Sequence, residues 1–173
     1  MILSVDISPP VKYSSSQLTQ NVPLFWQVYF FHTDPVTGEM FEPDWKRTLE
    51  GEHFGAGFGY SLAKADTNGD GTPDLVVGAP FHDGGNGGRG GAIYLYLSKE
   101  ASKNGLNIRE CVKVMGRERE SQFGLAISSA GDLNRDGYED FAVGSPYESD
   151  GRGAVYIFFG GESNTKTYYT CFW

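Results

Sequence analysis

The sequence predicts an all-β fold in which four-stranded blades repeat along the chain, as in a partial β-propeller. Glycine supplies 24 of the 173 residues, about twice its average share, and aromatic residues supply 14%. Short runs of aromatic and β-branched residues alternate with glycine-rich turns, a pattern typical of strands. The same series of runs occurs again about 65 residues later. Repeats of this length that hold four short strands favour propeller blades over a sandwich.

Four landmarks define the repeat. It begins with a Phe-Gly run at residues 58–63 and again at 123–128. An aspartate-rich turn, a Val-Gly-Ala/Ser-Pro run and a Gly-Ala-Ile/Val-Tyr run then follow in the same order in both copies. The three runs predict one short strand each, and a fourth strand is expected to end near Gly116. A single helical turn is expected at residues 99–102.

A partial copy precedes these two units, because residues 28–31 resemble the tyrosine-rich run at 93–96. We therefore divide the chain into five segments. These are an unassigned segment at 1–25, the back half of a blade at 26–57, a complete blade at 58–122, the front three-quarters of the next blade at 123–160 and an atypical tail at 161–173. No fourth strand is recognisable in the tail, and about two and a half blades suggest a fragment or a truncated product.

The charge and hydropathy of the chain exclude two classes of contact. Fourteen Lys and Arg residues against 22 Asp and Glu residues give a formal net charge of −8, which is unsuited to nucleic-acid phosphates. No apolar run approaches the roughly 20 residues that span a bilayer, and the N-terminus does not resemble a signal peptide. We expect this segment to contact neither nucleic acid nor membrane. A disulfide and two free thiols are both open for Cys111 and Cys171, and Cys111 is expected to be buried in a strand.

The two aspartate-rich turns predict two calcium sites. In each turn, oxygen-bearing side chains occupy positions 1, 3, 5 and 9, and glycine at position 6 allows the left-handed backbone that curls the loop. The backbone carbonyl at position 7 adds another oxygen. The predicted ligands are Asp66, Asn68, Asp70, Thr72 and Asp74 in the first loop and Asp132, Asn134, Asp136, Tyr138 and Asp140 in the second. Such an all-oxygen set, rich in carboxylates, suits Ca²⁺.

These loops differ from EF-hands. Position 12, where an EF-hand has a bidentate glutamate, is Val77 in the first loop and Val143 in the second, and strands follow instead of helices. We therefore expect Asp74 and Asp140 to close the two sites. Solvated turns are the alternative interpretation. The recurrence of the pattern at matching places in two repeats argues against it.

Other candidate sites are weaker. The three histidines, His32, His53 and His82, lack the spacing of metal ligands and are expected in turns or at the surface. The glycine-rich segment 83–91 lacks the ending of a phosphate-binding loop, so we expect it to connect two strands. No nucleophile with an adjacent base and no paired acid and base stand out, so we expect no enzyme activity.

The order of these motifs resembles the FG-GAP repeat, and in particular that of the integrin alpha subunits. The resemblance covers residues 26–160, and Gly90–Tyr94 is most similar to the laminin-binding subgroup. It implies a seven-bladed propeller in the extracellular head of a cell-surface receptor for cell–matrix or cell–cell adhesion and signalling. It also implies a heterodimer with an integrin beta subunit and a ligand in the extracellular matrix or on another cell, laminin among them. The calcium loops would be structural and would lie away from the ligand.

Two alternatives to an integrin stay open. One is the FG-GAP accessory propeller of a secreted enzyme such as the glycosylphosphatidylinositol-specific phospholipase D, which a histidine-rich catalytic domain elsewhere in the protein would favour. The other is a surface protein that has FG-GAP repeats and no beta partner. A downstream membrane span with a short basic-aromatic tail would favour the integrin over both.

Overall fold

The described residues fold almost entirely into antiparallel β-strands, which confirms the predicted all-β fold class. The computed structural model describes residues 27–28, 49–53, 55–83, 90–102, 105–162 and 168–172. The unassigned segment 1–25, His32 and the glycine-rich residues 84–89 lie outside these ranges. Within them, no helix has the length and apolar character needed to cross a membrane.

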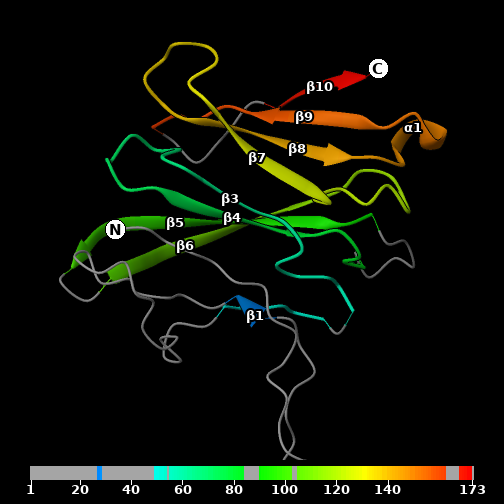
Figure 1. Ribbon diagram of the computed structural model, residues 1–173, viewed down its shortest axis with the longest axis horizontal. Coiled ribbons are helices and arrows are strands. Elements are labelled where there is room, and N and C mark those ends of the chain that lie inside the picture. Colours follow the sequence, from blue (N-terminus) through cyan, green and yellow to red (C-terminus); the bar gives the residue numbers. More distant parts are fainter. Residues whose placement is uncertain are drawn as a thin grey trace, which may run out of the picture.

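Two four-stranded sheets follow each other along the chain, and in each the strands neighbour one another in sequence order. The first consists of β3 (Leu62–Ala65), β4 (Asp74–Ala79), β5 (Ala92–Ser102) and β6 (Gly105–Met115). The second consists of β7 (Ala126–Gly131), β8 (Asp140–Ser145), β9 (Ala154–Phe158) and β10 (Tyr168–Phe172). A short pair, β1 (Gln27–Val28) with β2 (Leu49–Glu50), lies on the other side of the first sheet (Figure 1). The three sheets therefore stack in chain order, as successive propeller blades do.

The second sheet contains a fourth strand that the repeat pattern did not reveal. β10 pairs with β9 from Tyr168 opposite Phe158 to Phe172 opposite Ala154. This part of the tail carries none of the repeat's motifs, but its Tyr-Tyr-Thr-Cys-Phe run has the aromatic and β-branched residues that suit a strand. The free edge of β9 supplies backbone partners for it. The structure thus differs from the expectation that this blade breaks off before its fourth strand.

The helical turn expected at residues 99–102 is part of a strand instead. β5 continues to Ser102 because its end pairs with β6, with Ser102 opposite Gly105. Pairing with a neighbouring strand here outweighs local helix propensity. The helical turn in the described residues is α1 (Glu148–Gly151), in which Ser149 and Asp150 have left-handed φ angles of 55° and 59°.

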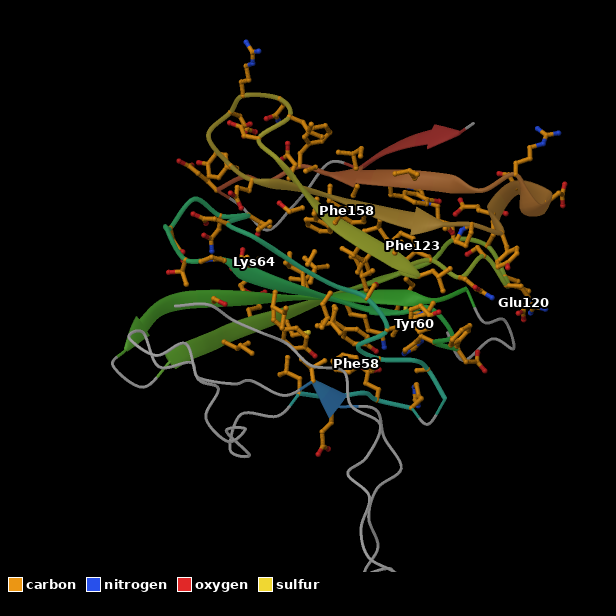
Figure 2. All side chains as sticks on the ribbon, in the orientation of Figure 1. Phe58, Tyr60, Lys64, Glu120, Phe123 and Phe158 are labelled. Carbon is orange, nitrogen blue, oxygen red and sulfur yellow. The ribbon has the colours of Figure 1, made fainter. Side chains whose placement is uncertain are left out.

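Side chains of the first sheet pack in two separate cores, one on each face. Alternation along β4 and β5 sends Val77 and Tyr94 to one face and Val76 and Ile93 to the other. Phe58 lies in the first core with Val28 of β1, whereas Phe123 and Phe158 lie between the two large sheets (Figure 2). The first sheet is therefore covered on both faces, and all six residues of β4 are buried.

Glycines allow the two large sheets to approach each other closely. A Cβ at Gly78 would lie 2.2 Å from the carbonyl oxygen of Gly124. That oxygen accepts a 2.7 Å hydrogen bond from Ser61 Oγ. The backbone N–H of Phe123 donates to the Gly90 oxygen at 3.0 Å. The glycine in the Val-Gly-Ala-Pro run is thus needed because backbone of the next blade occupies the space of a side chain.

Candidate metal centres

The two aspartate-rich loops occupy equivalent places in consecutive sheets. One joins β3 to β4 and the other joins β7 to β8, and both lie at the same end of the molecule, toward the left of the view (Figure 1). The structure therefore brings all ten predicted ligands to one edge, five in each loop. The β-strands before and after each loop fix its two ends.

The first loop is curled by hydrogen bonds from its own backbone to its polar side chains. Asp66 accepts from the backbone N–H of Asp70 at 3.1 Å through Oδ1 and from that of Gly71 at 2.8 Å through Oδ2. Asn68 Oδ1 also accepts from the Asp70 N–H, at 2.9 Å. Asp70 Oδ1 accepts from the N–H of Thr72 at 2.9 Å. The side chains at positions 1, 3 and 5 thus fold back over the centre of the loop.

The second loop reproduces this network position by position. Asp132 accepts from the N–H groups of Asp136 and Gly137 at 3.0 Å and 2.9 Å. Asn134 Oδ1 accepts from the Asp136 N–H at 3.1 Å, and Asp136 Oδ1 accepts from the Tyr138 N–H at 3.0 Å. The second loop has one further hydrogen bond, from Asn134 Nδ2 to Asp136 Oδ2 at 2.8 Å. The same residue types at the same spacing therefore give the same local structure twice.

The backbone has a left-handed conformation at positions 4 and 6 of both loops. Gly69 and Gly71 have φ angles of 70° and 81° in the first loop, and Arg135 and Gly137 have φ angles of 61° and 92° in the second. Glycine adopts this left-handed conformation without a steric penalty. At Arg135 it is uncommon for a residue with a side chain. The glycine predicted at position 6 is therefore used as expected.

The aspartates at position 9 lie below the loops and hold them to the sheets. Asp74 is 1% exposed, and its carboxylate accepts from Thr67, through both the backbone N–H at 3.1 Å and the hydroxyl, and from the Ser98 N–H at 2.9 Å. Asp140 is 0% exposed and accepts from the N–H groups of Leu133 and Gly160 at 2.7 Å and 2.9 Å. Both carboxylate oxygens of each residue are thus engaged by backbone donors.

The chemistry of the loop side chains fits a hard cation. Every predicted ligand atom is an oxygen. An ionised carboxylate can accept about four hydrogen bonds, so those from the backbone leave lone pairs that can bind an ion. The three aspartates of each loop do not, however, meet at one point. Among the His, Cys, Asp and Glu side chains of the described residues, three have ligand atoms that all lie within 4.8 Å of one another, and they are outside these loops: Glu52, His53 and His82. A closing role for Asp74 and Asp140 stays a prediction.

The two loops are also joined to each other. The N–H of Asp66 donates to Glu139 Oε2 at 2.9 Å, and the N–H of Glu139 donates to the Asp66 carbonyl at 3.0 Å. A Cβ at Gly69 would lie 2.9 Å from the ring of Tyr138. Partial burial, and then the carboxylates of Glu162 and Asp136, raise the pKa of the Tyr138 phenol above its usual value. Asp66, at position 1 of the first loop, is thus held in place by Glu139, at position 8 of the second loop.

Two residues outside the loops differ from expectation in their exposure. His82 lies in a turn, one of the two places expected, because its N–H donates to the Ala79 carbonyl at 3.1 Å, but it is 2% exposed and so is not at the surface. Burial together with the Lys113 ammonium lowers its pKa. No spacing signal predicts its proximity to His53, because the two residues lie on either side of the first aspartate-rich loop and the fold brings them together. Cys111 lies in β6 as expected, but it is an exposed free thiol. β6 ends the sheet; its Val112 and Val114 pack against the core between the two large sheets, and its Ile108 packs against the other core.

Comparison with known proteins gives the same repeat and a consistent set of relatives. Residues 58–96 and 123–158 match the family model described as FG-GAP repeat. The chain is 42% identical over 119 residues to integrin alpha-6 of Gallus gallus, which covers 69% of this chain and 10% of that protein. It is 44% identical over 113 residues to integrin alpha-7 of Homo sapiens, covering 65% of this chain and 9% of that protein.

The similarity extends to invertebrate proteins. Integrin alpha-PS2 of Drosophila melanogaster is 41% identical over 117 residues, covering 65% of this chain and 8% of that protein. The matched region therefore spans about a tenth of the length of these curated relatives.

Proposed function

We propose that this chain is a propeller segment of a cell-adhesion receptor stabilised by calcium, because residues 58–96 and 123–158 match the FG-GAP repeat and the chain is similar to integrin alpha subunits. The observation that carries this proposal is the pair of matching loops on consecutive blades, each with the same hydrogen-bond network. Two independent copies of one donor arrangement are better explained by a shared ligand than by two chance turns.

The proposed ligand is Ca²⁺ in both loops. In the first loop, Asp66, Asn68, Asp70, the Thr72 carbonyl and Asp74 would hold it. In the second, the same roles fall to Asp132, Asn134, Asp136, the Tyr138 carbonyl and Asp140. Each loop contains three aspartates, and a divalent cation that drew their carboxylates together would reduce the local charge from about −3 to about −1. The ion would thus relieve repulsion between like charges and stabilise the folded state over the unfolded one.

The proposed role of the whole protein is extracellular and non-catalytic. We propose that the full receptor lies in the cell membrane with this segment on its outer face, pairs with an integrin beta subunit and binds a matrix or cell-surface ligand. The similarity to alpha-6 and alpha-7, together with the Gly90–Tyr94 run, supports the laminin-binding subgroup and makes laminin the first ligand to test. The calcium loops would support the blade edges and would not contact that ligand.

Thermal unfolding with and without calcium tests this proposal. Extracellular calcium modules bind at about 0.1–1 mM, so 1 mM Ca²⁺ at two sites is expected to add about 1–3 kcal/mol and to raise Tm by roughly 2–10 °C over a chelated sample. The double variant Asp70→Ala, Asp136→Ala should lose this shift. Asp150→Ala, which removes an aspartate outside both loops, should keep it. A calcium shift that survives in the double variant would contradict the assignment of the ions to these loops.

A further inference from the structure

A second kind of metal site is suggested by a cluster at the junction between the β1–β2 pair and the first sheet. Glu52 and His53 follow β2, and His82 lies just beyond the end of β4. Each offers one ligand atom, and these atoms all lie within 4.8 Å of one another. Glu52 Oε2 is 3.5 Å from His82 Nε2, and the rings of His53 and His82 are 5.1 Å apart between centroids, inclined at 64°.

The hydrogen bonding of His82 is incomplete for a buried residue. Its side chain is 2% exposed, and among the described residues its Nδ1 has no hydrogen-bond partner, while its Nε2 lies 3.5 Å from Glu52 Oε2. Good hydrogen bonds to nitrogen are about 2.7–3.2 Å long, and a buried polar atom without a partner costs about 1–3 kcal/mol. Nε2, the nitrogen that faces Glu52, has no hydrogen bond of good length and is the one available to an ion.

The donor set selects a different class of cation from that of the calcium loops. Two imidazole nitrogens and one carboxylate oxygen suit a borderline-soft divalent metal, of which zinc is the usual example, whereas calcium prefers oxygen ligands alone. Zinc binds such atoms at about 2.0–2.2 Å, which places neighbouring ligands about 3.4 Å apart. Glu52 and His53 are exposed, so their side chains are free to rotate inward by the small amount required, and water can complete the coordination.

We propose that Glu52, His53 and His82 form a binding site for a zinc-class divalent cation. Such an ion would join the segment after β2 to the end of β4, and so would connect one blade to the next. This proposal does not depend on the adhesion function or on occupation of the calcium loops.

Lys113 is the internal competitor for this site. Its ammonium forms an ion pair with Glu52 Oε2 and lies 5.5 Å from the centre of the Tyr94 ring. A metal ion and this ammonium would repel each other across the same carboxylate. Lys113 is partly exposed at 30%, so it can turn toward solvent when a metal binds. Removing its charge should therefore strengthen metal binding, an effect opposite to that of removing a ligand.

Calorimetric titration of the chain with Zn²⁺ tests the proposal. The background carries Cys111→Ser and Cys171→Ser to exclude thiol ligands, and Asp70→Ala with Asp136→Ala to weaken the acidic loops. We expect one zinc ion per chain that 1 mM Ca²⁺ does not displace. Glu52→Gln and His53→Ala should each weaken binding at least tenfold, and Lys113→Met should strengthen it several-fold. His32→Ala, the matched control at the chain's remaining histidine, should leave the affinity unchanged.

Cobalt provides a second measurement that does not depend on the stability of a variant. Co²⁺ bound to two imidazoles and a carboxylate in a tetrahedral site gives visible absorption bands, which should be present in the parent protein and lost in His53→Ala. Because His82 is buried and its replacement risks unfolding the protein, the exposed Glu52 and His53 and the gain expected for Lys113→Met are the deciding variants. Equal zinc affinity in the parent, His53→Ala and His32→Ala proteins would overturn the proposal.

Discussion

The two large sheets share one sequence motif but differ in what covers them. In the first sheet, β4 is buried along its whole length, because β1 and Phe58 pack on one face and the second sheet packs on the other. In the second sheet, β9 alternates between buried and partly exposed residues, because the described residues cover only the face toward the first sheet. The repeat therefore specifies strands and loops, while neighbouring blades supply the burial.

The two aspartate-rich loops show the same contrast. Their internal hydrogen bonds match, yet the first loop is partly covered by Tyr138 and Glu139 of the second, whereas most of the second is exposed, including Leu133 at 54%. Local sequence thus determines how each loop folds, and its position in the stack determines how firmly it is supported.

The largest expected effect comes from removing the buried aspartate below each loop. Asp74→Ala would leave the donors on Thr67 and Ser98 buried without partners, and we expect a loss of about 3–5 kcal/mol in the free energy of unfolding. Asp140→Ala removes the hydrogen bonds from the N–H groups of Leu133 and Gly160 and no hydroxyl donor, and so it should cost less. Urea unfolding in the presence of chelator measures both. An equal or larger loss at Asp140 would break the proposed difference in support between the loops.

A smaller effect separates the covered and uncovered faces of the two sheets. Ile93 and Val155 hold the same place in the repeat, but Ile93 is 0% exposed between the sheets and Val155 is only partly buried. We expect Ile93→Ala to cost about 3 kcal/mol and Val155→Ala to cost about 1 kcal/mol or less, because a cavity forms only where neighbours surround the side chain. The comparison requires equal urea m-values, which show that both variants unfold from the same compact state. Similar losses at the two sites would show that something also covers the outer face of the second sheet.

Much of this architecture was predictable because the repeat presents the same signals twice. The Phe-Gly and Val-Gly-Ala-Pro runs located β3, β4, β7 and β8, and the aspartate spacing located both loops with their left-handed glycines. β10 was missed because its residues fit a strand without carrying any motif of the repeat. The extension of β5 was missed because it depends on pairing with β6, which local propensity does not report.

Contacts between distant segments could not be predicted from residue types alone. The cluster of Glu52 and His82 forms only when the segment after β2 meets the end of β4, which are separated by the whole of the first loop. The contact between Asp66 and Glu139 likewise depends on how two blades stack. The sequence also gave Asp74 and Asp140 a role as ligands, and it contained no sign that backbone donors engage both oxygens of each.

The smallest expected effect tests whether one loop supports the other. Glu139 is in the second loop, but its carboxylate accepts from the N–H of Asp66, the first ligand of the first loop. We would measure this effect by calcium titration in an Asp136→Ala background, in which the first loop remains intact. Glu139→Ala should weaken calcium binding by the first loop about two- to fivefold, because an exposed hydrogen bond to a charged acceptor contributes about 0.5–1 kcal/mol.

Pro73→Ala is the matched control at position 8 of the first loop, and its effect is measured on calcium binding by the second loop in an Asp70→Ala background. Proline has no N–H and no polar side chain with which to hold a neighbour, so this variant should bind calcium as its parent does. Support would then run in one direction, from the exposed loop to the covered one, and equal losses in the two variants would show instead that both loops respond to any change at position 8.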